Sequence, residues 1–201
     1  MFIDCSKDRI VVYTGLEKIV IPFFEVEKYF TNLLIEQYKK NPFSLLYCIH
    51  GPGTFTNMRV AVLSIQTLNY FAWWWIQYML IDKFSLYSKL YLQWLLSRYG
   101  IVTIGQRRRV ALFDSRDCSY TVLLYSDALV RCFDHNDELL SGDNFFVDDC
   151  YGEDFIDLQS FPCVISFLYE SGDIYFVSIW SKNNISDCFV CSDSIEPFYL
   201  A

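Results

Sequence analysis

The sequence predicts an α/β fold in which an N-terminal half alternates strands with helices and a C-terminal half is rich in strands. Three observations support this. Between residues 2 and 97, apolar runs of strand length alternate with segments of helical period. A G-P-G turn at residues 51–53 joins an apolar run to a long helical pattern. After Gly100, short apolar runs recur with little helical periodicity. Alternating strands and helices favour right-handed crossovers between parallel strands.

The first 50 residues predict a strand meander, a helix and a buried strand. Residues 2–5, 9–14 and 18–23 are apolar runs separated by short turns, and Pro22 indicates that the third strand ends there or lies at an edge. Residues 25–40 repeat apolar side chains at i, i+3 and i+4, and the helix closes on Lys39 and Lys40, as its dipole prefers. Residues 44–49 form a nearly continuous apolar run, typical of a buried parallel strand.

The remaining elements predict two subdomains with a boundary at Gly100. A long helix is expected over about residues 56–74, a strand over 78–81 and a helix over 83–97, which completes an N-terminal α/β subdomain of residues 1–99. The C-terminal subdomain, residues 100–201, is expected to be strand-rich, acidic and reduced in size. Its predicted strands are 101–104, 109–113, 121–125, 163–169 and 174–179. The acidic stretch 127–159 is expected to be irregular.

Composition limits the functional classes. The chain has 201 residues, of which 53% are hydrophobic and 19% aromatic, and a formal charge of −8. Residues 1–100 hold 10 Lys/Arg and 7 Asp/Glu, net +3, whereas residues 101–201 hold 6 and 17, net −11. The net negative charge argues against binding of nucleic acid by electrostatic attraction to the whole protein. The aromatic excess instead indicates apolar surface that is buried or offered to a partner.

Cysteine usage and the N-terminal sequence favour a cytoplasmic protein. The opening MFIDCSKDRI has neither the basic nor the apolar region of a signal peptide, so a reducing compartment with free thiols is expected. Cys188 and Cys191 form a C-x-x-C pair, but no second pair at similar spacing completes a zinc site. We therefore expect no metal.

The uncharged run from residue 60 to residue 81 is long enough to cross a bilayer. It contains Ser64, Gln66 and Asn69, which are costly in hydrocarbon, and its three consecutive tryptophans do not form belts at two interfaces. The run is therefore interpreted as a buried helix, and no membrane partner is expected.

The G-P-G turn admits a structural and a functional interpretation. Gly and Pro commonly mark strand-to-helix turns, but the exposed N-terminus of the following helix would also attract an anion or phosphate. His50 beside the turn is a candidate general base or an ordinary loop histidine. Asp4 is a candidate nucleotide-side acid that would hold a metal-bound nucleotide, or a turn residue capping Ser6.

The longer string GPGTFTNMR resembles the GPGSFTGLR signature of the bacterial TsaB family, also called YeaZ. The signature residues here are Gly51, Pro52, Gly53, Thr54, Phe55, Thr56, Asn57 and Arg59. The opening I-D-C-S is similar to the family's I-D-T-S, Asp114-Ser115-Arg116 to its D-A-R turn, and the closing P-F-Y-L to its P-x-Y-L. Residues 127–190 match weakly, and Phe23-Phe24 replace the family's His-Ser.

The resemblance implies a two-subdomain fold of the actin-like ATPase and sugar-kinase (ASKHA) class. It implies a non-catalytic protein that binds and activates a TsaD-like enzyme, which forms N6-threonylcarbamoyladenosine (t6A37) in tRNA, together with a TsaE-like ATPase. Contact with tRNA would occur only through that complex. A homodimer in the absence of the partner, and a nucleotide at the partner interface, remain open; no cofactor is otherwise expected.

The chain's own residues agree with a non-catalytic role. Its two histidines, His50 and His135, are too far apart for the metal-binding H-x-x-x-H pair of a TsaD-type enzyme. The glycine-rich adenosine loop of active kinases is not visible. Arg59 is expected to fix the G-P-G turn through a carboxylate or carbonyl. The cluster Arg107-Arg108-Arg109 is interpreted as a solvated strand end or a minor phosphate contact.

The long helix is apolar around most of its circumference, which favours a partner covering one side and the sheet the other. A helix buried wholly by its own chain is the alternative. The residues expected at the partner interface are Tyr29, Leu33, Ala61, Val62, Ile65, Leu68, Asn69 and Ala72. Two rival functions remain, a small ATPase or kinase of the same fold and a diverged structural or membrane-surface protein.

Overall fold

The computed structural model of the chain describes residues 1–6, 9–14, 17–73, 75–92, 99–104, 109–133, 137–140, 144–148 and 188–199. These residues form two compact units. The first comprises Met1–Lys83 together with residues 188–199, and the second begins at Phe84. The predicted boundary at Gly100 therefore differs from the observed division, because the helix after Ile81 belongs almost entirely to the second unit and the end of the chain returns to the first.

The first unit is built on a six-stranded mixed sheet of order β10-β5-β4-β1-β2-β3. Its strands are β1 Phe2–Asp4, β2 Ile10–Tyr13, β3 Lys18–Ile21, β4 Leu45–Ile49, β5 Gln77–Ile81 and β10 Val190–Ser192. β1 pairs in parallel with β4, and β4 with β5, whereas β2, β3 and β10 are antiparallel to their neighbours. The predicted meander and the predicted buried parallel strand are thus confirmed, and β3 is an edge strand that ends before Pro22.

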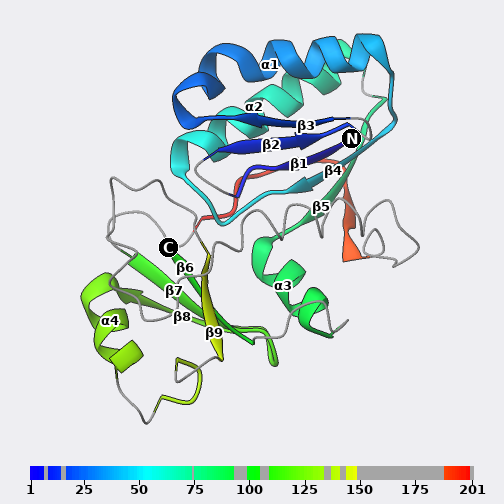
Figure 1. Cartoon of the computed structure of the whole chain (residues 1–201). Helices are drawn as coiled ribbons and strands as arrows, with labels where there is room; N and C mark the ends of the chain where they lie inside the picture. The colour runs from blue at the N-terminus through cyan, green and yellow to red at the C-terminus, as the bar shows by residue number, and fades with distance from the viewer. Residues whose placement is uncertain are drawn as a thin grey trace. The chain divides into compact units, whose positions relative to one another are not determined.

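Two helices, α1 Phe23–Lys40 and α2 Phe55–Phe71, cover one face of this sheet (Figure 1). They run side by side, and the Thr31 and Ser64 hydroxyls meet across them at 2.7 Å. Ile3, Val12 and Cys48 from the sheet pack with Phe30 of α1 and Ile65 of α2 in one core. On the opposite face, the rings of Phe2, Tyr47 and Phe189 pack together.

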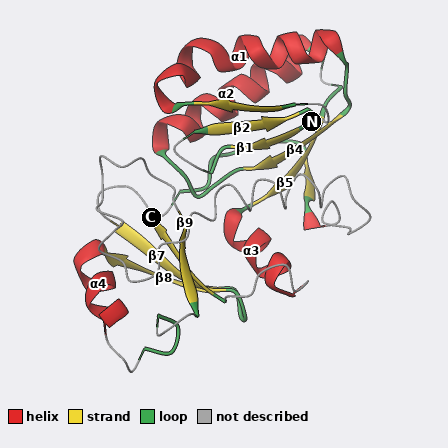
Figure 2. Cartoon of the chain, in the orientation of Figure 1, coloured by secondary structure: helices red, strands yellow, loops and turns green. Residues whose placement is uncertain are grey.

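Within its described residues, the second unit contains a four-stranded sheet of order β8-β7-β6-β9 and the helices α3 and α4 (Figure 2). Its elements are α3 Lys83–Leu92, β6 Gly100–Ile104, β7 Arg109–Asp114, β8 Ser119–Leu124, α4 Tyr125–Phe133 and β9 Phe145–Asp148. Leu112 packs with Ala128 of α4 on one side of the sheet, whereas Phe113, the next residue, stacks on Phe84 of α3 at 4.8 Å between ring centroids. Successive residues of β7 therefore place the two helices on opposite faces.

Two sequence expectations about elements are wrong. The long helix was expected to reach residue 74 but ends at Phe71, because Ala72 caps it and Trp73 has a left-handed φ of 57°. The stretch 127–159 was expected to be irregular, yet it contains most of α4 and all of β9. The acidic composition of the whole stretch does not apply to α4, in which Asp127 is the one acidic residue. The predicted strands 163–169 and 174–179, and residues 93–97 of the predicted helix, lie outside the described residues.

None of the helices in the described ranges combines the length and the apolar character needed to cross a membrane. The uncharged run from residue 60 to residue 81 instead forms most of α2, a turn and β5. Its Asn69 is buried, and the Asn69 Oδ1 accepts a hydrogen bond of 3.2 Å from the backbone N–H of Ile76. The polar residues that argued against a span therefore have structural roles in this unit.

Leu68 of α2 is fully buried in the core against the sheet, whereas Leu63, five residues earlier on another face of the helix, is 58% exposed. Leu68→Ala is expected to lower the free energy of unfolding by about 2–5 kcal/mol, because it leaves a cavity in a packed core. Leu63→Ala serves as the matched control, with an expected change within about 0.5 kcal/mol. Urea unfolding followed by circular dichroism measures both, and equal effects would contradict the assignment of the buried face.

Candidate functional site

The G-P-G turn lies at the carboxyl edge of the parallel strands, between β4 and α2. Its backbone is tied to neighbouring segments at three points. The His50 N–H donates to the Ile81 carbonyl at 3.1 Å, and the Lys83 N–H donates to the Gly51 carbonyl at 2.6 Å. The Phe198 N–H donates to the His50 carbonyl at 3.0 Å. The turn is therefore fixed by the end of β5, the start of α3 and the C-terminal segment.

Both positions of the turn require glycine, because backbone atoms of other segments lie where a side chain would be. Gly51 has a φ of 131°, and a Cβ built there would collide with the Phe198 carbonyl oxygen. A Cβ at Gly53 would lie 2.9 Å from the Cys5 carbonyl oxygen and from Ser6 Cα. The peptide bond between Gly51 and Pro52 is cis. Main-chain atoms of the protein itself thus fill the space beside this turn.

Thr54, a residue of the GPGTFTNMR string, caps the N-terminus of α2. Thr54 is buried and its Oγ1 accepts a hydrogen bond of 3.4 Å from the Asn57 N–H. Asn57 is also buried, so its side chain is directed into the unit. Phe55 is partly exposed and its ring lies 5.2 Å from that of Tyr199. The helix N-terminus therefore satisfies one of its free N–H groups with its own threonine.

Arg59 does not fix the turn as the sequence predicted. Its guanidinium lies over the Phe55 ring, 5.2 Å from the ring centroid, in a cation–π contact on the surface of α2. Burial raises the pKa of Tyr199, and the nearby charge of Arg59 only partly opposes that rise. Arg59, Phe55 and Tyr199 thus form a small aromatic and cationic group outside the turn.

Asp4 and His50 both have local partners. Asp4 is buried at the end of β1, and its Oδ1 accepts from the Ser6 N–H at 2.9 Å and from the Ser6 hydroxyl at 2.6 Å. This is the turn geometry that the structural interpretation predicted. The His50 Nδ1 lies 3.0 Å from the Glu196 carbonyl oxygen, a contact in which the Nδ1–H tautomer donates. The candidate acid and the candidate base are therefore both held by the protein's own backbone or hydroxyl groups.

Lys83 was missed by the sequence analysis. It is 1% exposed and lies at the first position of α3, directly after β5. A lysine at a helix start is ordinarily solvated, so no sequence signal marks its burial. Together with Asp4, it places one acidic and one basic side chain in buried positions at strand ends beside the turn.

The cysteines were expected to be free, and Cys5, Cys48, Cys118, Cys188 and Cys191 are free thiols. The sulfurs of Cys5 and Cys48 are 3.4 Å apart and buried, and their hydrogen bond, together with burial, raises the pKa of the Cys5 thiol. Cys191 is exposed and accepts from the Gln77 amide at 2.9 Å. In the described ranges, no group of three or more His, Cys, Asp and Glu side chains is arranged to hold a metal ion.

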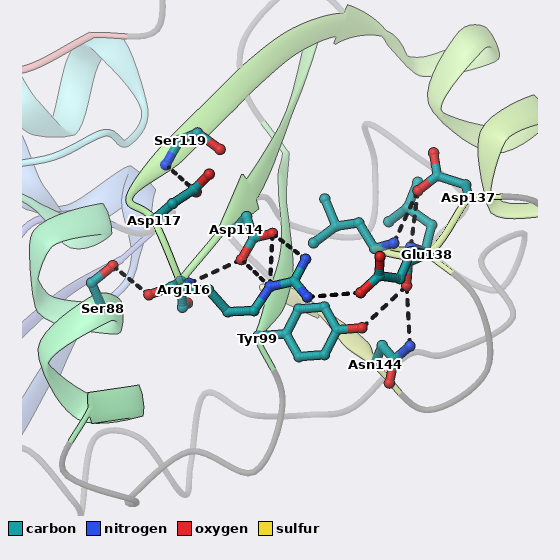
Figure 3. Close-up of polar contacts among 12 residues, drawn as sticks. Ser88, Tyr99, Asp114, Arg116, Asp117, Ser119, Asp137, Glu138 and Asn144 are labelled. Carbon is teal, nitrogen blue, oxygen red and sulfur yellow. Dashed lines mark hydrogen bonds and ion pairs between the residues drawn. The ribbon is translucent and has the colours of Figure 1, made fainter.

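The Asp114-Ser115-Arg116 turn forms a second polar cluster (Figure 3). The Arg116 guanidinium donates to both Asp114 oxygens, at 2.7 Å for the shortest bond, and to the Glu138 carboxylate at 2.8 Å. Its Cζ also lies 4.0 Å from the centroid of the Tyr99 ring. These hydrogen bonds to carboxylates raise the pKa of Arg116. With its charge already matched by two carboxylates, Arg116 ties the β7–β8 turn to a neighbouring loop and is a poor anion-binding group.

Of the basic cluster, only Arg109 lies in the described residues, where it is exposed at the start of β7. Arg107 and Arg108 lie outside them.

The residues expected at a partner interface are largely buried within the first unit. Tyr29 is exposed and Leu33 is half-buried, but the other six are in the core or close to it. These six are Ala61, Val62, Ile65, Leu68, Asn69 and Ala72. The prediction of this face is wrong because α1 and the sheet already cover it. These six residues are therefore not available for contact with another protein.

The exposed side of α2 contains both polar and apolar residues. Phe55, Arg59, Leu63 and Thr67 follow one another every four residues and are all exposed; we call them the α2 ridge. On α1, Phe24 and Tyr29 are also exposed. Arg59 and Thr67 were the available sequence signal, because charged and polar positions indicate which face meets solvent.

Gly51→Ala is expected to lower the free energy of unfolding by more than about 2 kcal/mol, because the new methyl group requires an unfavourable φ and meets the Phe198 carbonyl. Glu196→Ala is the control, since Glu196 contacts His50 through its backbone oxygen, which the substitution keeps. Thermal unfolding of both variants tests this, and a wild-type stability for Gly51→Ala would contradict the observed turn.

Thr54→Ala is expected to destabilise the protein by about 1 kcal/mol through loss of the N-cap. Thr54→Ser keeps the capping oxygen and is expected to retain most of the stability. Chemical denaturation distinguishes the two variants, and an equal loss would mean that the Thr54 methyl group, rather than its hydroxyl, matters.

Comparison with known proteins supports the fold. No family model matches the sequence, and no curated protein matches it. Among solved structures, an uncharacterized protein with similarity to peptidase YeaZ from Pseudomonas aeruginosa aligns with a TM-score of 0.51 and 13% identity, covering 100% of this chain and 98% of that one. YeaZ from Pseudomonas aeruginosa aligns with a TM-score of 0.41 and 14% identity, covering 61% of this chain. The alignment spans 66% of that YeaZ chain, just under two thirds of its length.

At these identities the similarity concerns the arrangement of the backbone. The alignment over the full chain carries the comparison, and it agrees with the mixed sheet and paired helices described above. The chain has a YeaZ-like α/β fold.

Proposed function

We propose that the chain is a non-catalytic, TsaB-like binding subunit that associates with a TsaD-like enzyme in t6A37 formation on tRNA. The observation that carries the proposal is the α2 ridge, a row of exposed side chains along a helix whose opposite side is buried in the core. Exposed Phe55 and Leu63 lie in this row, and apolar side chains exposed together commonly mark a protein interface. The YeaZ-like fold and the GPGTFTNMR string support the same assignment.

In this proposal the first unit supplies one half of a helical interface. α1 and α2 lie side by side, so Tyr29 and the α2 ridge are available to two helices of a partner. The contact would bury the aromatic and aliphatic groups at its centre and leave Arg59 at the rim. A TsaE-like ATPase would join the assembly, and tRNA would be held mainly by the enzyme, since the second half of the chain carries a net charge of −11 from 6 basic and 17 acidic residues.

The G-P-G turn argues against a catalytic role. An active ATPase or kinase of the ASKHA class would need this turn free to bind phosphate. The Phe198 carbonyl is packed against Gly51, and Thr54 caps the first turn of α2. Asp4 is bonded to Ser6. Calorimetry with ATP and Mg²⁺ addresses the rival function directly: heat of binding by the isolated chain would favour a small ATPase or kinase.

Leu63→Asp is expected to weaken association with the TsaD-like protein of the same organism at least about tenfold, because a charge would be buried at the contact. Val130→Asp is the matched control, since Val130 is 70% exposed on α4 of the other unit. Co-expression followed by size-exclusion chromatography measures the complex, and circular dichroism checks that each variant folds.

Two results would contradict the proposal. The wild-type chain would fail to co-elute at micromolar concentration, or Leu63→Asp would co-elute as well as Val130→Asp. Ile65→Asp is not a suitable probe, because Ile65 is fully buried in the core and its substitution would unfold the unit.

A further inference from the structure

Arg59 is the single charged residue of α2, and it stands in the α2 ridge between Phe55 and Leu63. The residues three and four positions away on the helix, where an ion-pair partner would lie, are Phe55, Thr56, Val62 and Leu63, and none of them is acidic. A cation near the start of a helix is also disfavoured by the helix dipole. The position of Arg59 therefore has no explanation in charge pairing within its own helix.

The elements beside α2 do not neutralise Arg59 either. On α1, Glu27 lies at about the same level along the helix pair, because the two helices run side by side in the same direction, and Lys28 follows it with the opposite charge. The C-terminal segment contributes Glu196, which is exposed. In the ranges that the structure describes, neither carboxylate forms an ion pair with Arg59. Its positive charge is therefore available to a group from outside the chain.

Ring contacts hold the Arg59 guanidinium in a defined place. Its Cζ lies 5.2 Å from the centroid of the Phe55 ring, which packs in turn on the ring of Tyr199 at 5.2 Å. A guanidinium that stacks on a ring keeps the N–H groups of its edge available for a carboxylate. Because the side chain folds back over the first residue of α2, a carboxylate here would also meet the favourable N-terminal end of the helix dipole. The group is therefore preorganised to bind an anionic side chain.

We propose that the TsaD-like partner supplies a carboxylate, from an aspartate or glutamate side chain, that binds Arg59 at the edge of the contact with the α2 ridge. This inference rests on the proposed function and deepens it. A partner that covers Phe55 and Leu63 displaces water on both sides of Arg59, and a cation that loses water requires a compensating charge. Since this chain provides none, the partner has to provide it. The surface that fits the ridge is thus an apolar face with an acidic residue opposite the first turns of α2.

A purely structural role for Arg59 leads to different expectations. If the guanidinium only holds the Phe55 ring, its substitution changes the stability of the free chain and leaves the rate of association with the partner unchanged. A charge at the edge of an interface acts mainly on the association rate and on its salt dependence, through long-range attraction. Binding kinetics therefore separate the two roles.

The test measures binding of the full chain to the TsaD-like protein of the same organism by surface plasmon resonance, at low and at high salt. Wild-type association is expected to slow as salt is added, because salt screens the attraction between Arg59 and the carboxylate. Arg59→Gln is expected to associate about threefold more slowly at low salt and to respond less to added salt. Arg59→Glu, which repels the carboxylate, is expected to associate at least about tenfold more slowly.

Two further variants serve as controls. Arg59→Lys keeps the charge but not the planar guanidinium, so it is expected to associate like the wild type and to dissociate at least about threefold faster. Arg109→Gln removes an exposed arginine from the second unit and changes the net charge by the same amount as Arg59→Gln. It is expected to bind like the wild type. Circular dichroism and thermal unfolding show whether each variant keeps the fold.

The inference is overturned if Arg59→Gln and the wild type associate at the same rate at low salt, or if Arg109→Gln slows association as much as Arg59→Gln does. In either case the complex still forms and Leu63→Asp still weakens it, so the proposed function stands without this inference. If the wild-type chain does not bind the TsaD-like protein at all, the proposed function and the inference fail together. The two failures therefore give different results.

Discussion

The architecture of the first unit depends on main-chain packing between the G-P-G turn and the C-terminal segment. The Phe198 carbonyl occupies the space beside Gly51 that any side chain would need, and the Phe198 N–H donates to His50. Ile195 of the same segment is buried in the core, and its carbonyl accepts from Gln66 of α2. Because backbone atoms make these contacts, the turn, the start of α2 and the end of the chain have to adopt their positions together.

The local part of this fold could be predicted from the sequence. The meander, the helix up to Lys40 and the parallel strand before the turn follow from apolar spacing and from Pro22 and Asn41-Pro42 as stop signals. The buried face of α2 was predicted wrongly, because Ala61, Leu63, Ile65 and Leu68 make the helix apolar on nearly all sides. Arg59 and Thr67 were the sequence signal for the exposed side, and contacts of the other side with α1 and the sheet agree with that signal.

The sequence identified the signature residues of the turn but not the contacts that they make. The signature residues lie together at the turn, and Thr54 is the N-cap that its side chain suits. Arg59 was assigned to the turn but lies over Phe55, and buried Lys83 had no sequence signal. The burial of a side chain and the ring that it packs on depend on segments distant in the chain. A local sequence pattern therefore cannot predict them. α4 was missed for a different reason: the acidic composition of residues 127–159 as a whole was read as irregular, although the helix itself holds one acidic residue and packs Ala128 against the second sheet.

The return of residues 188–199 to the first unit has a consequence for the order of folding. The second unit is inserted between two parts of the first, so β10 and Ile195 are synthesised only after the whole second sheet. Until then, β5 lacks its pairing with β10, and Gly51 lacks its contact with the Phe198 carbonyl. The sheet of the first unit is therefore completed only when these contacts of high sequence separation form.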